Sequence, residues 1–426
     1  MERNDPRYQA YVEILKEELI PAMGCTEPIA LAYAAAKARE VLGVLPDSVQ
    51  LQVSGSIIKN VKSVIVPNTG HLKGMEAAVA AGIIAGSAEK ELEVISEVSE
   101  EKKSAIRDYL QTVPITIEHT EQGRVFDIVV TERCGQDYAR VRIADYHTNI
   151  CRIEKNGTVL YEVPLLDETV QEDARADRSL LNMQDIWDFA ETADLRDVAD
   201  LLERQIRYNN AIAEEGLLGD YGANIGRVLL TTYGNDVSNR AKAKAAAGSD
   251  ARMNGCELPV IINSGSGNQG ITCSVPLIEY AKELHSGKEK LYRALIISNL
   301  VAIHEKTGIG TLSAYCGAVS AGAGAGAGIV YLCGDGYQAA IHTVVNALAI
   351  VSGIVCDGAK ASCAAKIASS VDAALLGYNM YKCNQEFKGG DGIVMKDIET
   401  TIKGIGRLGK DGMRQTNEEI IRLMMS

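Results

Sequence analysis

Apolar residues recur at helical spacing near both ends of the chain, and this pattern predicts mostly α-helix. Residues 7–20 carry apolar side chains three or four positions apart. An Ala-rich run follows, and Thr26 as N-cap with Gly43 at the C-terminal end predicts a helix over residues 27–42. A Gly/Ala-rich helix is expected at 74–87. From residue 180 onward the spacing is again helical.

The middle of the chain alternates apolar and polar residues instead. After a helix expected near 98–111, such runs continue to about residue 160 and predict strands with one solvated face. Asn156 and Gly157 separate the last two runs, which is a strong signal for a two-residue hairpin. Short strands are also expected at 49–53 and 64–66.

These patterns predict an α+β protein of two domains, as the length of 426 residues suggests. Residues 1–88 and 170–426 are expected to form a mainly helical, Gly/Ala-rich catalytic domain. Residues 89–169 are expected to form a small inserted α+β domain with a regulatory or oligomerisation role. The acidic and polar segment 164–179 is interpreted as a linker.

Composition narrows the class of protein. A hydrophobic fraction of 46% and a charged fraction of 23% are typical of a soluble globular protein. The net charge of -13 disfavours binding to nucleic acid or to an anionic membrane. The first residues are charged and lack a secretory signal, so the ten cysteines are expected to be reduced thiols of a cytoplasmic protein.

Two stretches without Lys or Arg, 307–334 and 337–356, have the length of a transmembrane hairpin. Their Gly and Ala residues contribute little transfer free energy, and polar residues interrupt both runs. Closely packed buried helices are therefore the favoured interpretation. The alternating Gly/Ala tract at 322–328 is assigned to this packing.

A glycine-rich motif at 264–270 follows an apparent strand and precedes a helix-like stretch. Gly265, Gly267 and Gly270 match the dinucleotide-binding fingerprint, and Glu289 lies at the expected distance after them. A broader interpretation is a nest of backbone N–H groups that binds a phosphate or a substrate carboxylate. A tight glycine turn that serves packing alone stays open as an alternative.

Several thiols and one histidine are candidates for chemistry. Cys25 precedes a predicted helix, whose dipole would favour a thiolate that acts as nucleophile or base, although a plain buried cysteine fits the local sequence equally. Cys356 and Cys363 are two helical turns apart, and with Cys316 they could hold a cluster, or they could simply be buried. His71 is the best placed histidine, in a polar turn between strand and helix, although a surface role fits it equally. No lysine context indicates pyridoxal phosphate.

Taken together, the motifs at 24–28, 67–70 and 264–270 and the three separated cysteines resemble the L-cysteine desulfidase family. That family is related to the α part of iron–sulfur L-serine dehydratases, and the resemblance covers nearly the whole chain. It implies a [4Fe–4S] cluster bound by Cys316, Cys356 and Cys363. One iron would then lack a protein thiolate and could act as a Lewis acid toward a leaving group.

The resemblance also implies an activity, the β-elimination of L-cysteine to pyruvate, ammonia and hydrogen sulfide without pyridoxal phosphate. Cys25 would accept the α-proton, or it could instead approach the cluster when substrate is absent. The substrate carboxylate is expected in the glycine nest, with two asparagines in polar turns as helpers. The binding residues would then be Ser264, Gly265, Ser266, Gly267 and Asn268, and the expected catalytic residues are Cys25, His71 and Asn68.

Other functions remain open from the sequence. L-Serine dehydration could use the same cluster, since nothing in the sequence distinguishes the two leaving atoms. A non-enzymatic amino-acid-binding iron–sulfur protein and a dinucleotide-dependent oxidoreductase are further alternatives. The expected partner is a small amino acid, and a homodimer is the expected assembly.

Overall fold

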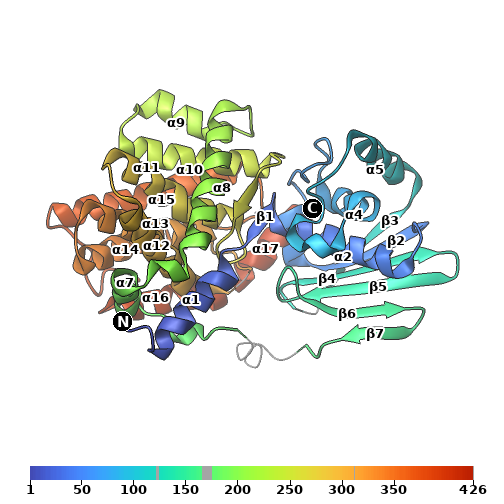
Figure 1. Ribbon diagram of the computed structural model, residues 1–426, viewed down its shortest axis with the longest axis horizontal. Helices are drawn as coiled ribbons and strands as arrows, with labels where there is room; N and C mark the ends of the chain where they lie inside the picture. The colour runs from blue at the N-terminus through green and yellow to red at the C-terminus, as the bar shows by residue number, and fades with distance from the viewer. Residues whose placement is uncertain (121–123, 166–174, 311, 426) are drawn as a thin grey trace.

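The computed structural model describes residues 1–120, 124–165, 175–310 and 312–425, and it divides into a helical lobe and a sheet-bearing lobe (Figure 1). The chain starts in the helical lobe, passes into the sheet lobe, and returns after its last long strand. The predicted class, mainly helical α+β, is confirmed.

The helical lobe contains most of the second half of the chain. Its helices are α1 (Pro6–Glu18), α7 (Met183–Thr192), α8 (Ala199–Leu218), α9 (Ile225–Tyr233), α10 (Val237–Met253), α11 (Gly267–Glu283), α12 (Lys288–Ile309), α13 (Gly317–Cys333), α14 (Tyr337–Val351), α15 (Ser362–Lys382), α16 (Ile398–Arg407) and α17 (Arg414–Met425). Short 3₁₀ turns at Arg178–Leu180 and Leu195–Asp197 and a π-helical turn at Leu408–Gly412 connect some of them. The last helix, α17, reaches back and packs against the sheet lobe.

The sheet lobe has six strands in the order β3-β2-β4-β5-β6-β7. β2 pairs in parallel with β3, and every other neighbouring pair is antiparallel. The strands are β2 (Ser48–Ser54), β3 (Ile115–Thr120), β4 (Asp127–Cys134), β5 (Asp137–Ala144), β6 (Ile150–Lys155) and β7 (Thr158–Glu162), and the helices are α2 (Thr26–Leu42), α3 (Gly55–Val61), α4 (Gly74–Ala85), the 3₁₀ segment Ala88–Glu93 and α5 (Glu100–Thr112). The helix α2 packs on β4 and β5, and α4 packs on α2 (Figure 1).

Several local predictions agree with this arrangement. The two-residue turn of Asn156 and Gly157 joins β6 to β7, and both residues have positive φ, as a type I′ turn requires. The helix expected over 27–42 is α2, which ends at Gly43 in the left-handed conformation, but its N-cap is Cys25 and not the predicted Thr26. Of the expected linker, residues 166–174 lie outside the described residues.

Other local predictions were wrong. Residues 64–66 form no strand and contribute only a bridge between Ile65 and Lys73. Residues 55–61 form the helix α3 and do not continue the strand region. The sequence does not reveal this helix, because the segment is short, buried on all sides and without a helical period. β2 lies inside the sheet although it precedes residue 89, so the sheet-bearing lobe includes chain upstream of the expected boundary.

A small second sheet links distant parts of the chain. β1 (Pro21–Met23) pairs antiparallel with β8 (Pro259–Ile261). The buried side-chain amide of Asn209 forms hydrogen bonds with the free edge of β8. Its Oδ1 accepts from the Ile261 N–H at 2.8 Å, and its Nδ2 donates to the Ile261 carbonyl at 3.1 Å. β1 leads into the turn at Cys25, and β8 leads into the glycine motif. The pairing therefore fixes the two turns relative to each other.

Close helix contacts explain the high glycine content of the helical lobe. A Cβ atom on Gly324 of α13 would lie 2.4 Å from the carbonyl oxygen of Ser298 on α12. A Cβ atom on Gly270 of α11 would lie 2.0 Å from the carbonyl oxygen of Ile261. The packing role assigned to the Gly/Ala tract is thus confirmed. None of the helices within the described ranges combines the length and apolarity that a bilayer crossing requires.

We expect Gly324→Ala to lower the free energy of unfolding by about 1–3 kcal/mol, because the added methyl group forces α12 and α13 apart. Urea denaturation measures the change. The matched control is Gly353→Ala, where the added Cβ meets no atom within 4 Å and the effect should stay within about 0.5 kcal/mol. Equal effects of the two substitutions would contradict the close-packing explanation.

Candidate active site

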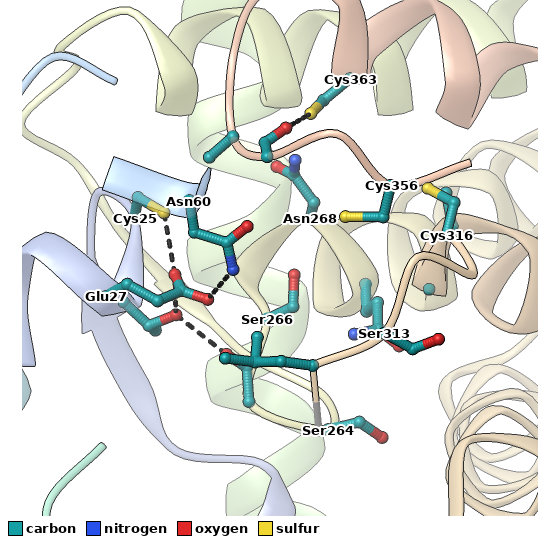
Figure 2. A pocket seen from close by; sticks show the side chains of 18 of the residues that line it. Cys25, Glu27, Asn60, Ser264, Ser266, Asn268, Ser313, Cys316, Cys356 and Cys363 are labelled. Carbon is teal, nitrogen blue, oxygen red and sulfur yellow. Dashed lines mark hydrogen bonds between the residues drawn. The ribbon is translucent and has the colours of Figure 1, made fainter. Parts of the chain in front are cut away.

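A cavity of about 820 Å³, including the part open to solvent, lies between the two lobes. Both lobes contribute its walls (Figure 2). The sheet lobe, including the start of α2, supplies Cys25, Thr26, Glu27, Lys59, Asn60 and His147. The helical lobe supplies, among others, Arg252, Ser264, Gly265, Ser266, Asn268, Gln269, Lys306, Ser313, Cys316, Cys356 and Cys363.

Four helices begin at this cavity: α2, α11, α13 and α15. Their N-cap residues are Cys25, Ser266, Cys316 and Ala361, and none of these side chains caps its helix by a hydrogen bond. Uncapped helix starts present free backbone N–H groups and the positive end of the helix dipole. The cavity therefore favours anionic ligands, although the protein as a whole is acidic.

Cys25 is buried, with 3% of its surface exposed, and its thiol donates a hydrogen bond of 3.0 Å to Glu27 Oε2. Burial and the adjacent Glu27 carboxylate raise the pKa of Cys25 well above its ordinary value. The sequence predicts a pKa of Cys25 lowered by the helix dipole, and this prediction is wrong. Burial of the thiol and contact with the Glu27 carboxylate both disfavour the thiolate, and together they outweigh the partial positive charge at the start of the helix.

Glu27 connects the polar groups on the sheet-lobe side of the cavity. Burial opposes its ionisation, but the neighbouring His147 and the hydrogen bond from Cys25 prevail and lower the pKa of this carboxyl. Asn60 Nδ2 donates to Glu27 Oε1 at 2.9 Å, and His147 Nε2 lies 3.8 Å from the same oxygen. Glu27 is thus a buried carboxylate held in its ionised form.

The glycine motif touches the sheet lobe across the cavity. Thr26 Oγ1 donates to the Gly265 carbonyl at 3.0 Å. Gly265 has a positive φ of 74°, and a Cβ atom there would lie 3.2 Å from His147 Cε1. A side chain at this position would be strained and would press on His147. The close approach of the two lobes at this point therefore requires glycine.

The three predicted cluster cysteines line the same cavity. Tyr315 and Val355 form an antiparallel bridge. Beside it the Cys356 N–H donates to the Ala314 carbonyl at 2.6 Å, and the Cys316 N–H donates to the Ile354 carbonyl at 3.1 Å. Two thiol-bearing segments are thus held side by side. Cys363 lies in the first turn of α15, where its thiol faces the Gly358 carbonyl at 3.5 Å (Figure 2).

Comparison with known proteins identifies the family of the chain. Residues 89–422 match the family model described as serine dehydratase alpha chain. The chain belongs to this family. It is 61% identical over its whole length to a UPF0597 protein of Desulfitobacterium hafniense (strain Y51), of which it covers 99%. It is 52% identical to a UPF0597 protein of Lachnoclostridium phytofermentans and 46% identical to one of Treponema denticola, with 98% and 100% of this chain covered and 100% of each relative.

The three cysteines at the cavity of this chain have the ligand chemistry that an iron–sulfur cluster needs. All three cysteines are free thiols, the ligand type such clusters use. As free thiols they influence one another: burial first, then the charges of Cys356 and Cys363, raise the pKa of Cys316 to about 12. Within the described ranges no three His, Cys, Asp or Glu side chains converge on one point as a single metal ion would need.

Two buried lysines lie near these thiols. Burial lowers the pKa of Lys306 to about 8, while the neighbouring Cys356 and Cys316 oppose this change. Burial also lowers the pKa of Lys59, and Cys356 is the first charge that opposes it. Cations at this end would balance the negative charge of thiolate ligands.

Other predicted site residues lie elsewhere. Asn68 and His71 do not line the cavity. Asn68 Nδ2 donates to the Ile95 carbonyl at 2.8 Å, which gives it a structural role. The turn that contains both residues supports the Cys25 turn, because a Cβ atom on Gly24 would lie 2.7 Å from Pro67 Cγ. Gly267 lies behind the wall that the rest of the motif 264–268 forms.

The dinucleotide interpretation of the glycine motif is not supported. That fingerprint belongs to a parallel βαβ unit, whereas among the described strands β8 pairs with the antiparallel β1 alone. Glu289 lies in the first turn of α12 and pairs with Arg293 on the surface.

Sequence reasoning missed several residues of the cavity wall: Glu27, Lys59, Asn60, His147, Arg252, Gln269 and Lys306. For some a signal existed. Glu27, for example, lies inside the motif at 24–28. His147 lies in a loop of the sheet lobe, and no local pattern connects it to Cys25.

We expect the Cys25 thiol of the cluster-free protein to react with iodoacetamide at pH 8 at least about tenfold more slowly than the exposed Cys383, because alkylation needs the thiolate. Its rate should still rise above pH 9, since its pKa is raised. Peptide mass spectrometry after timed alkylation measures both rates.

Glu27→Gln provides the control for this prediction. Removal of the carboxylate charge should speed alkylation of Cys25 and leave Cys383 unchanged. If Cys25 were the fastest thiol in the unsubstituted protein, the helix start would dominate its pKa and our assignment of the cause would be wrong.

Proposed function

We propose that this protein eliminates sulfide from L-cysteine without pyridoxal phosphate, and that a [4Fe–4S] cluster held by Cys316, Cys356 and Cys363 assists the reaction. The observation that supports this most directly is that the three thiols share one cavity with Cys25. Membership in the serine dehydratase alpha-chain family supports a lyase that acts on a small amino acid. When bound, the cluster would supply an iron without a protein thiolate, which can act as a Lewis acid toward the leaving sulfur.

In the proposed reaction Cys25, as thiolate, accepts the α-proton of L-cysteine. Its raised pKa makes the thiolate scarce at neutral pH but a stronger base once it is formed. The electron pair of the broken Cα–H bond forms the Cα=Cβ bond, and the electrons of the Cβ–S bond leave with sulfide. Glu27 Oε2, 3.0 Å from the Cys25 sulfur, accepts a hydrogen bond from the thiol that results and holds it in place.

The remaining aminoacrylate tautomerises to an imine, and one water molecule hydrolyses it to pyruvate and ammonia. This step needs water but no further oxidant or reductant. The solvent-open part of the cavity can admit water and release both products.

L-Serine dehydration is the second candidate, since the matching family is described as serine dehydratase alpha chain. The same α-proton would leave, and the leaving group would be hydroxide instead of sulfide. Nothing in the described cavity wall separates the two leaving atoms.

We expect anaerobically reconstituted protein to contain iron and acid-labile sulfide, and Cys316→Ala to lower both to background because one of three ligands is lost. The matched control is Cys333→Ala at the exposed end of α13, which should keep the cluster. Pyruvate release from L-cysteine and from L-serine, with sulfide release from L-cysteine, identifies the substrate.

Three outcomes would contradict this proposal. Full iron content in Cys316→Ala would contradict the ligand assignment. Faster turnover of L-serine would favour the dehydratase. Reconstituted protein that turns over neither amino acid would favour a binding protein.

A further inference from the structure

Arg252 is a buried cation that no described residue pairs with. It lies in the last turn of α10, only 2% of its surface is exposed, and it lines the cavity. In the part of the chain that the structure describes, its Nε atom has no hydrogen-bond partner and no carboxylate forms an ion pair with its guanidinium group. A buried charge is costly unless an opposite charge accompanies it. An anionic ligand beside Arg252 would therefore stabilise the buried charge.

The start of α11 lies directly against this guanidinium. A Cβ atom on Gly267 would lie 2.3 Å from Arg252 Nε, so only the missing side chain leaves room for Arg252 there. Ser266, the N-cap residue of α11, makes no capping hydrogen bond with its side chain. The free N–H groups of the first turn and the guanidinium together form an anion site with a planar, two-pronged donor.

The same wall carries acceptors that lack donors. Asn268 Oδ1 and Gln269 Oε1 are buried and have no hydrogen-bond partner among the described residues. Figure 2 places Asn268 between Cys25 and the cysteines of the helical lobe. A ligand that carries an ammonium group beside its anionic group would satisfy these oxygens and Arg252 together.

The other buried cations of the cavity are already engaged. Lys59 Nζ donates to Asn417 Oδ1 at 2.6 Å, and Lys306 Nζ donates to the Gly310 carbonyl. Both also lie near the cluster cysteines. Arg252 is instead close enough to Cys25 that its charge opposes the rise in the pKa of that thiol. The anion site is thus on the Cys25 side of the cavity.

We propose that Arg252 binds the α-carboxylate of the substrate, and that Asn268 and Gln269 accept hydrogen bonds from its α-ammonium group. The substrate class is then a free α-amino acid zwitterion, which excludes peptides and amidated amino acids. This inference rests on the proposed function. The main contact of the substrate carboxylate is then the side chain of Arg252, which lies outside the glycine motif at 264–270, and not the backbone N–H groups of that motif alone.

The test measures binding without turnover. L-Alanine lacks a leaving group, so its binding to the cluster-containing protein can be followed by isothermal titration calorimetry, with L-alaninamide as the ligand that lacks the carboxylate. Arg252→Met should weaken L-alanine binding about 10- to 100-fold, because a charge-assisted pair is lost. Binding of L-alaninamide should be weak in the unsubstituted protein and should not weaken further.

Two further variants make the test decisive. Arg252→Lys keeps the charge and most of the volume but loses the two-pronged geometry, so it should fold and show an intermediate loss of affinity. Arg240→Met, on the same helix but paired with Glu283 away from the cavity, should bind L-alanine as the unsubstituted protein does. Thermal denaturation checks that each variant is folded.

The outcomes separate this inference from the proposed function. Arg252-dependent L-alanine binding without turnover of L-cysteine or L-serine would support the inference and contradict the lyase assignment. Turnover of L-cysteine with unchanged L-alanine affinity in folded Arg252→Lys would overturn the inference and leave the lyase assignment in place. Absence of L-alanine binding in the unsubstituted protein, or an equal loss for L-alanine and L-alaninamide in Arg252→Met, would also overturn it.

Discussion

The central constraint on this molecule is the concentration of positive electrostatic potential in one buried place. Four uncapped helix starts meet at the cavity, and three buried cations, Lys59, Arg252 and Lys306, line it. Such an arrangement is unfavourable unless anions occupy it, since buried charges and free N–H groups both need partners. The ionised Glu27 meets part of this need. Thiolate ligands and a substrate carboxylate would meet the rest.

Pairings between distant segments hold this arrangement together. β1 pairs with β8, the Tyr315 and Val355 segments form a bridge, and Thr26 reaches across the lobes to Gly265. Each contact is small, but each joins parts of the chain that carry a functional side chain. Glycine at the close approaches, as at position 265, lets backbones meet where any side chain would separate the lobes.

The cavity also has two chemically distinct ends. At one end three thiols lie near two lysines, which suits a metal cluster and a leaving group. At the other lie the Cys25 thiol, the buried Glu27 carboxylate and Arg252, a cation for which the described residues provide no carboxylate partner. An amino acid that spans these ends would present its β-substituent to the thiols and its α-carbon to Cys25. The elimination we propose uses this separation.

The sequence by itself determined the local elements and the identity of the thiols. Helical and alternating periods predicted α2 and the strands β4 to β7, since hydrophobic spacing is a local property, and the motif residues Cys25, Cys316, Cys356 and Cys363 do share a cavity. Tertiary structure alone decided the electrostatics. The raised pKa of the Cys25 thiol depends on burial and on Glu27, and the unpaired state of Arg252 depends on which carboxylates fail to reach it. Solvation and charge contacts between residues far apart in the chain leave no periodic trace in the sequence, so only the folded arrangement determines them.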